Sequence, residues 1–433
     1  MKKNNKIFHS LTISAELFKN TSILISGTVL AQLIPILLQP LLRRYYTPET
    51  FGAYTVYLSI IGILIVVTSL KYELAIILPK KEKEAANVFF LALILNFLFN
   101  ILITILILLF KKDIASFLNF SEEFIYYLYF VPLGTFLFNF YQSINYWLIR
   151  KKKFFALSQN KFIRRGVEGS VQVGFKYVQV LQGLIIGDIL GHAANISSGI
   201  YQSIKNGLKL EYFSLVKIRY ILTKYIEYPK FNVIPSFLSA CSYLLPAIFI
   251  NKFYTSEYTG YFDLSKLVLS IPLALVAASI SNVLLERISV KFRNNKSFIK
   301  DIFPIAILIL FIALVEIFVV RIYGKEIFKW VFGVNWEFSG EISRILVWSY
   351  AFNFLVASFS SLFISMKKIK VLSMWQLLYF LSIISLILFK NYPFIDFIKI
   401  YVIIEVACYT LILALMIFII LKYESNLFGR IDE

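Results

Sequence analysis

The stretch that decides the fold is residues 86–110, which read ANVFFLALILNFLFNILITILILLF. It contains no charged side chain and exceeds the roughly 20 apolar residues that a helix needs to cross a bilayer. A run of this kind predicts a membrane-spanning helix. Apolar runs of similar length recur along the whole chain, so the sequence predicts a polytopic membrane protein.

The composition of the 433-residue chain agrees with that prediction. Hydrophobic residues make up 59% and charged residues 16%, whereas soluble domains are about half apolar and about a quarter charged. This excludes an ordinary soluble enzyme, a disordered chain and a collagen-like fibre. The only two cysteines, Cys241 and Cys408, lie in apolar runs, which excludes a disulfide scaffold. The net charge of +19 indicates basic cytoplasmic loops rather than nucleic-acid binding.

Twelve segments are long and apolar enough to be transmembrane helices, so the predicted fold class is all-α. The first is longer than a signal-peptide core of about 7–15 residues and is interpreted as an uncleaved span. The fifth is the most polar, because it contains Glu168, Gln172 and Lys176. The spans are placed near residues 20–42, 52–78, 86–110, 124–149, 166–183, 184–204, 229–250, 260–284, 301–320, 342–366, 371–389 and 396–421.

The basic residues orient these spans. If the N-terminus is cytoplasmic, most of the 44 Lys and Arg residues fall in segments that are then cytoplasmic, which supports an even number of spans with both termini inside. The chain is accordingly divided into two six-helix lobes. The divisions are a cytoplasmic segment 1–19, an N-lobe 20–204, a cytoplasmic linker 205–228, a C-lobe 229–421 and a cytoplasmic tail 422–433.

Two short segments in matching places of the two lobes resemble each other. Tyr46-Thr47-Pro48-Glu49-Thr50-Phe51-Gly52 and Tyr254-Thr255-Ser256-Glu257-Tyr258-Thr259-Gly260 share Tyr, Thr, Glu and Gly, and each joins the first two helices of a set. Six helices return the chain to the same side, so the halves are expected to be parallel repeats about an axis along the membrane normal. In transporters with repeated halves, the substrate path lies at their interface. Chance similarity between two loops is the alternative.

Polar residues in the repeat-related spans recur every three or four positions, which places them on one helical face. Polar groups are costly in hydrocarbon, so such a face contacts either a cavity or another helix. Asp263 and Lys266 are three residues apart and could instead neutralise each other. The candidate cavity residues are Gln32, Gln39 and Arg43 in span 1, Glu73 in span 2, Asn232 and Tyr243 in span 7, and Asp263 and Lys266 in span 8.

Further charged residues lie within predicted spans. Lys176 could hold an anionic head group or pair with Glu168. Asp188 and His192 are four residues apart, so they could load and release a proton or form a structural hydrogen-bonded pair. Lys71 and Glu405 are also placed inside spans.

Several kinds of chemistry have no motif in this sequence. There is no phosphate-binding G-x-x-x-x-G-K-[S/T] loop, and His9 and His192 are the only histidines, without metal-ligand spacing. No long, carboxylate-rich outer loop indicates the external chemistry of a glycan polymerase. We therefore expect no enzyme activity, no metal and no cofactor, with energy supplied by an ion gradient, a partner or the substrate's own gradient.

The segment Pro40-Leu41-Leu42-Arg43-Arg44-Tyr45-Tyr46-Thr47-Pro48-Glu49, with Phe51-Gly52, resembles the polysaccharide-unit flippases of Wzx type. So do Lys71-Tyr72-Glu73-Leu74-Ala75-Ile76-Ile77-Leu78-Pro79-Lys80 and the basic segment Trp147-Leu148-Ile149-Arg150-Lys151-Lys152-Lys153. These flippases belong to the multidrug/oligosaccharidyl-lipid/polysaccharide exporter superfamily. The resemblance implies two lobes around a central, cationic cavity. It makes Arg43, Arg44, Lys71 and Lys266 candidate ligands of a diphosphate, although Lys stands at two positions where the family usually has the bidentate Arg.

The resemblance also implies a function. The expected substrate is an undecaprenyl-diphosphate-linked sugar repeat unit of O-antigen or capsule, moved to the outer leaflet by alternating access. The expected partners are the lipid-linked oligosaccharide, the bilayer, a glycan polymerase and a chain-length regulator. A multidrug or ion-coupled exporter of the same fold is the alternative, with Glu73 and Asp263 as cation ligands. A scaffold protein of a glycan-assembly complex is a third class.

Overall fold

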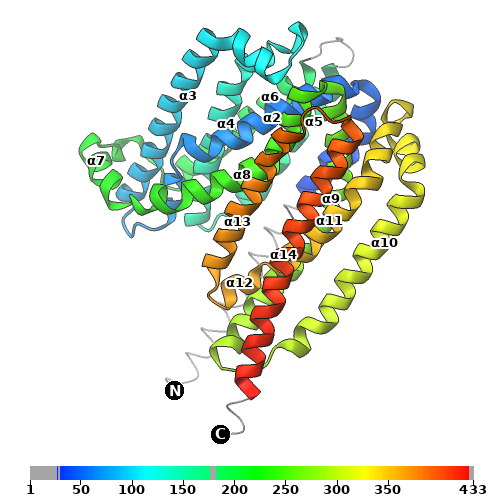
Figure 1. The fold of residues 1–433 in the computed structure, drawn as a ribbon. Coiled ribbons are helices and arrows are strands. Elements are labelled where there is room, and N and C mark those ends of the chain that lie inside the picture. The colour runs from blue at the N-terminus through cyan, green and yellow to red at the C-terminus, as the bar shows by residue number, and fades with distance from the viewer. Residues whose placement is uncertain (1–26, 28–29, 176–181, 429–433) are drawn as a thin grey trace. The chain divides into compact units, whose positions relative to one another are not determined.

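A computed structural model describes residue 27 and residues 30–175 and 182–428. These residues form helices and connecting turns without a β-strand, which confirms the all-α fold class. After a helix over residues 30–45, the long helices in chain order are α2 (Pro48–Thr68), α3 (Glu82–Leu118), α4 (Tyr127–Arg150), α5 (Phe154–Gly174), α6 (Gly183–Lys205), α8 (Glu227–Phe253), α9 (Ser256–Arg293), α10 (Ile299–Phe332), α11 (Glu337–Phe359), α13 (Ile369–Ile384) and α14 (Phe394–Phe428) (Figure 1). Two short helices, α7 (Leu215–Lys224) and α12 (Ser361–Ser365), lie between them.

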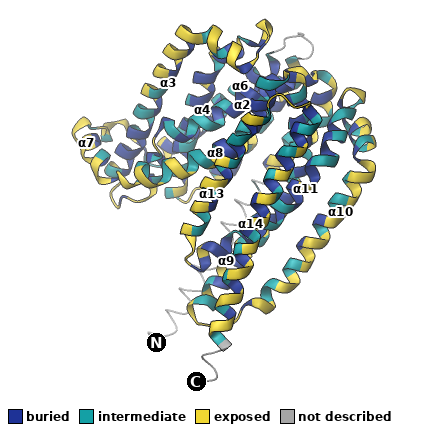
Figure 2. Cartoon of the chain, viewed as in Figure 1, coloured by how far each residue is buried: buried dark blue, intermediate teal, exposed yellow. Residues whose placement is uncertain are grey.

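Among the described residues, helices occupy most of the predicted spans, and nine helical segments are long and apolar enough to cross a membrane. Those nine do not include α5 or α6, which carry more polar residues. Helices α3 and α10 present long exposed apolar faces, visible as yellow along both ribbons in Figure 2. Faces of this kind are suited to contact with lipid.

The prediction that the second span continues to residue 78 is wrong. Helix α2 ends at Thr68, and Leu70 and Lys71 have positive φ angles of 50° and 61°. This left-handed backbone is unfavourable for residues with a Cβ atom and ends the α-helix. A 3₁₀ helix, η1 (Tyr72–Ile77), follows. Lys71 therefore lies at the turn before η1, and Glu73 lies in η1, rather than within a spanning helix.

The predicted start of the fifth span at residue 166 is also wrong, because α5 begins at Phe154. The early turns of α5 pack on α6 through polar side chains: Asn160 Nδ2 donates to Gln202 Oε1 at 2.8 Å, and Ser198 Oγ donates to Asn160 Oδ1 at 2.8 Å. Such a contact leaves no hydropathy signal. The segment 205–228, predicted as a plain linker, contains α7, and the last helix continues past residue 421 to Phe428.

The chain forms two compact units. The first comprises the described residues up to Tyr46 together with Val56–Ala240, and buries a cluster around Tyr72, Ile144 and Trp147. The second comprises Thr47–Thr55 and Cys241–Glu433, and buries a larger cluster that extends along α9, α10, α11, α13 and α14. Within the second unit, α11 packs against α9, α10 and α14.

The two repeat segments contact each other inside the second unit. In each, a threonine caps the following helix: Thr50 N donates to Thr47 Oγ1 and Tyr258 N donates to Thr255 Oγ1, both at 3.2 Å. A Cβ atom at Gly52 would lie 1.6 Å from the Ser256 carbonyl oxygen, and one at Gly260 would lie 1.9 Å from the Pro48 carbonyl oxygen. Each helix start therefore approaches the backbone of the other at its glycine. The matching caps and the reciprocal approach support the internal repeat.

The start of α10 is capped by a side chain from the end of α14. The buried Glu424 carboxylate accepts from Phe298 N at 3.0 Å and Ile299 N at 3.2 Å, next to the positive end of the helix dipole. Replacing Glu424 with Ala is expected to cost about 1 kcal/mol, as for other lost caps, and to lower the midpoint of thermal unfolding in detergent. The exposed neighbour Ser425→Ala is the control. An unchanged midpoint in the Glu424 variant would show that the cap contributes nothing.

Candidate functional site

The predicted cavity residues of the first helix differ in exposure. Arg43 is 2% exposed, and its Nε donates to Gln39 Oε1 at 3.0 Å. Gln39 and Arg43 thus form one polar pair, as their spacing of four residues predicts. Gln32 and Arg44 are exposed, so the stripe is not uniformly buried.

Glu73 belongs to a buried polar cluster at the end of α2. Its carboxylate accepts a hydrogen bond from Ser69 and lies 3.9 Å from Lys71 Nζ. Asn139 of α4 donates to Ser69 Oγ at 3.1 Å. Lys71 and Glu73 are therefore brought together, and the turn around Leu70 positions both. The carboxylate is held by donors of its own unit, which makes Glu73 a buried, charge-compensated group.

A second charged cluster lies between α5 and α6. Arg165 Nη1 donates to both oxygens of Glu168 at 2.9 and 2.8 Å, and Arg164 Nη2 donates to Asp188 Oδ1 at 3.3 Å. His192 Nε2 lies 3.6 Å from Asp188 Oδ1. Asp188 and His192 are thus brought together as predicted, but the two arginines were missed. They were assigned to a loop, since hydropathy did not reveal the first half of α5.

Lys176 lies outside the described residues, so neither interpretation of it is tested. Glu168 has two cationic neighbours among the described residues. Arg164 Nε lies 3.7 Å from its Oε2, and Arg165 forms the two hydrogen bonds given above. The ring of His192 packs against Phe138 at 5.2 Å between centroids. These contacts make the cluster part of the packing between α4, α5 and α6.

In the second unit, Lys266 lies over Tyr243. Its Nζ donates to the Tyr243 carbonyl oxygen at 2.8 Å and lies 3.3 Å from the centre of the Tyr243 ring. A cation at this distance is attracted by the electron-rich face of the ring. Asp263 lies one turn earlier on α9, and its charge and that of Lys266 attract each other. Asn232, in the first unit, donates to Tyr228 O at 3.2 Å within α8.

A cavity of about 520 Å³ lies among α8, α9, α11 and α14 of the second unit. Sequence reasoning recognised Tyr243 as a cavity residue and Glu405 only as a buried charge. The signal that could have found the cavity is the spacing of Tyr401, Glu405 and Tyr409 on one face of α14. The polar residues that line it are Tyr243, Ser270, Ser281, Asn282, Ser349, Tyr350, Asn353, Ser360, Tyr401, Glu405 and Tyr409.

Glu405 is the charged group of that cavity. It is 4% exposed and accepts hydrogen bonds from Ser349, from Tyr379 at 2.6 Å and from Tyr401. Asn353 Nδ2 donates to Tyr409 OH at 2.8 Å. The tyrosines, the amide and the carboxylate therefore form one hydrogen-bonded wall.

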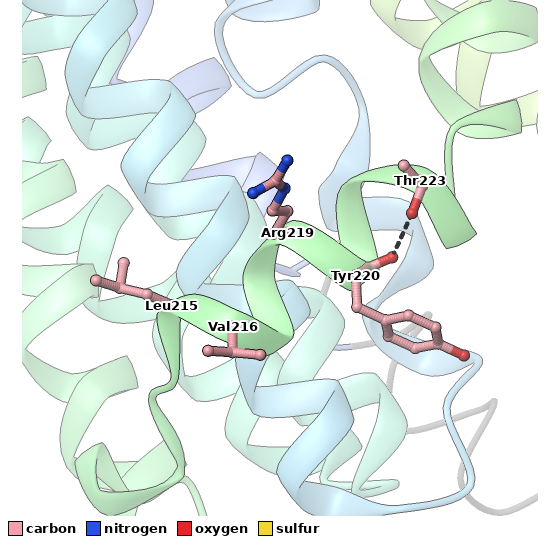
Figure 3. A pocket seen from close by; sticks show the side chains of 5 residues that line it. All are labelled: Leu215, Val216, Arg219, Tyr220 and Thr223. Atoms are coloured by element: carbon pink, nitrogen blue, oxygen red, sulfur yellow. Dashed lines mark hydrogen bonds between the residues drawn. The ribbon is translucent and has the colours of Figure 1, made fainter.

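Helix α7 carries a shallow surface pocket lined by Leu215, Val216, Arg219, Tyr220 and Thr223 (Figure 3). Leu215 and Val216 are 70% and 83% exposed, whereas Ile218 and Ile221 on the other face are buried. At the end of the helix, a hydrogen bond from Lys224 to Glu84 of α3 raises the pKa of the Lys224 ammonium. The inner face and this ion pair attach α7 to the first unit, and the apolar outer face remains exposed.

Comparison with known families and structures bears on the fold. The sequence profile of a family described as polysaccharide biosynthesis protein matches residues 41–340. No curated protein sequence matches the chain. Among solved structures, an inward-facing multidrug resistance MATE family transporter of the MOP superfamily is 14% identical with a TM-score of 0.70, covering 90% of this chain and 94% of that one.

Two further structures share the fold. The lipid II flippase MurJ in an inward closed conformation is 15% identical with a TM-score of 0.72, covering 94% of this chain and 91% of that one. A variant of the Vibrio cholerae MATE transporter VcmN is 13% identical with a TM-score of 0.57, covering 96% of this chain and 98% of that one. Identities this low establish a shared fold. All three are transport proteins.

Proposed function

The chain belongs to the family of polysaccharide biosynthesis proteins, and we propose that it is a flippase for lipid-linked oligosaccharides. It would move undecaprenyl-diphosphate-linked repeat units from the cytoplasmic to the outer leaflet of the bacterial inner membrane by alternating access. The product would be used in O-antigen or capsule synthesis, by a glycan polymerase with its chain-length regulator. Both termini would face the cytoplasm.

The observation that carries this proposal is the combination of the family match with the fold of a lipid II flippase. That neighbour is a flippase of lipid II, which supports a lipid-linked substrate for this chain. Buried or half-buried cations within helices are costly in a membrane and indicate a functional site. Arg43 and Lys266 are cations of this kind in this chain.

We propose Arg43, in the first unit, and Lys266, in the second, each as a separate binding position for the diphosphate. Gln39 orients the Arg43 guanidinium from Nε, and the Nη groups could form the paired hydrogen bonds that suit phosphate oxygens. Lys266 supplies a point charge, oriented by the Tyr243 carbonyl. Lys71, whose Nζ lies 3.9 Å from the Glu73 carboxylate, and the exposed Arg44 are also proposed ligands of the diphosphate.

Ion-coupled export of drugs or other small molecules is the second candidate, because the MATE transporters share the fold. It would use carboxylates rather than cations. Glu73, Asp188 with His192, and Asp263 are the groups that it would require to bind or release an ion.

Replacing Lys266 with Gln is expected to reduce flipping at least tenfold, since one charge contact to a diphosphate oxygen typically contributes about 1.5–3 kcal/mol. In a strain lacking the gene, undecaprenyl-linked units are expected to accumulate in the inner leaflet. Wild-type protein should relieve the accumulation, and Lys266→Gln and Arg43→Ala should not.

The matched control is Lys399→Gln, because Lys399 is a cation of the same unit that is 55% exposed and paired with Asp396. It should relieve the accumulation fully. A normal leaflet distribution in the deletion strain, together with lost resistance to cationic dyes, would contradict the flippase and favour the exporter. Full relief by Lys266→Gln would contradict the diphosphate assignment alone.

A further inference from the structure

We infer that the cavity of the second unit binds the uncharged sugar that is joined directly to the diphosphate of the substrate. The inference rests on the proposed function and adds to it a binding site and a sugar class. The cavity lies entirely within residues of the second unit, among α8, α9, α11 and α14.

The size of the cavity fits a small organic ligand. Its volume of about 520 Å³ falls within the roughly 300–1,000 Å³ of small-molecule sites and far exceeds what a single ion needs. Among the described residues, no group of three or more His, Cys, Asp or Glu side chains could hold a metal. The positive charge of Lys266 interacts with Glu405, which further disfavours a cation beside that carboxylate.

The chemistry of the wall matches a sugar. A pyranose presents apolar C–H faces together with hydroxyl groups that both donate and accept, so it is recognised by aromatic rings next to amides and carboxylates. Tyr243, Tyr350 and Tyr401 supply rings, and Ser270, Ser281 and Asn282 supply small polar groups on the α9 side. A polyprenyl chain would leave these polar groups without partners, which is costly at a buried site.

Glu405 and Asn353 are the groups that would hold the sugar hydroxyls. An ionised carboxylate offers about four acceptor positions, and Ser349, Tyr379 and Tyr401 donate to Glu405 from the protein side. Asn353 uses Nδ2 on Tyr409, and its amide also carries an acceptor oxygen. Because the carboxylate repels anions, an acidic sugar is disfavoured in this cavity.

Tyr243 joins the cavity to the proposed diphosphate ligand. Its ring lines the cavity, and its carbonyl accepts from Lys266 Nζ at 2.8 Å. A diphosphate beside Lys266 would therefore place the sugar bonded to it next to Tyr243. This order along one helix pair, with the cation first and the polar cavity next, matches the order of groups in a sugar diphosphate lipid.

The test compares three soluble probes on the full-length protein in lipid nanodiscs: geranyl diphosphate, the same compound carrying glucose, and the same compound carrying glucuronic acid. Trp375 stacks on Tyr379 with 5.3 Å between ring centroids, so its fluorescence can report occupancy. Wild-type protein is expected to bind the glucose probe at least tenfold more tightly than the other two. Asn353→Leu and Glu405→Gln should lose that preference yet retain the affinity for geranyl diphosphate.

Two controls separate the possible outcomes. Gln376→Leu removes an amide of the same unit outside the cavity and should keep the preference, whereas Lys266→Gln should weaken all three probes equally. Equal binding of the three probes by wild-type protein, or quenching by sodium ions without any sugar preference, would overturn the sugar site. Neither result would contradict the proposed flippase function. That function is contradicted only by the leaflet assay, if the deletion strain shows a normal leaflet distribution of undecaprenyl-linked units. Loss of binding of every probe in both Asn353→Leu and Glu405→Gln would also overturn the assignment. The milder variant Tyr409→Phe removes one hydroxyl group of the cavity wall. If it binds the glucose probe with an unchanged preference in that case, the cavity does not bind the sugar.

Discussion

Valine at position 260 is expected to prevent the second unit from folding normally. The nearest atoms to a Cβ at Gly260 are the carbonyl oxygen, carbonyl carbon and Cα of Pro48, at 1.9, 2.7 and 3.1 Å. All three belong to the backbone, so no side-chain rotation can relieve the clash. Overpacking of a core costs about 1–3 kcal/mol when side chains can adjust, and a backbone clash is expected to exceed the upper value.

The measurement is the amount of protein in the membrane and its unfolding midpoint in detergent. Gly166→Val provides the matched control, because nothing lies within 4 Å of a Cβ at that helical glycine. Gly52→Val should resemble Gly260→Val, since its Cβ would lie 1.6 Å from Ser256 O. Both changes separate the same two segments, so the double variant should cost clearly less than the sum of the single variants. Additive effects, or a Gly260→Val protein as stable as Gly166→Val, would contradict the reciprocal contact.

Replacing Arg164 with Leu is expected to destabilise the first unit by about 3–5 kcal/mol, as for other buried ion pairs that lose one partner. Arg164 has a side chain that is 14% exposed, and it contacts both Asp188 and Glu168. Its loss leaves the buried Asp188 carboxylate without the guanidinium that donates to it, while His192 Nε2 stays 3.6 Å away. The unfolding midpoint in detergent should fall by many degrees.

A second substitution distinguishes charge from packing. If the uncompensated carboxylate causes the loss, Asp188→Asn in the Arg164→Leu background should recover a large part of it. The exposed pair Lys399–Asp396 serves as control, where Lys399→Leu should change stability by less than about 1 kcal/mol. Failure of Asp188→Asn to rescue would assign the effect to lost packing of the arginine side chain.

Hydropathy located most of the helices and misplaced those whose contacts are polar. Residues 86–110 lie inside α3, as their uninterrupted apolar character requires. By contrast, the predicted start of α5 is too late, because Asn160 and Arg164 are polar residues that form hydrogen bonds to α6. The turn at Leu70 and Lys71 was missed because no glycine or proline marks it.

The contacts of the candidate site likewise fall into those that the sequence predicts and those that only the structure shows. A spacing of four residues places Gln39 and Arg43 on one helical face and Asp188 next to His192, and in the structure the two members of each pair lie close together. No spacing could pair Glu405 with Ser349 and Tyr379, which lie on other helices. Arg164 and Arg165 likewise gained their role only from the packing of α5 on α6.

The sequence by itself determined the membrane class, the all-α fold and the repeat of the Tyr-Thr-x-Glu segment, because apolar length and local periodicity are properties of a single stretch of chain. Only the tertiary structure decided the reciprocal approach of Gly52 and Gly260, the partners of Asp188 and the cavity around Glu405. Those features depend on backbones and polar groups from distant segments meeting at hydrogen-bond or van der Waals distance. In an apolar bundle, each buried polar group must find such a partner, and its position in the sequence does not show on which helix that partner lies.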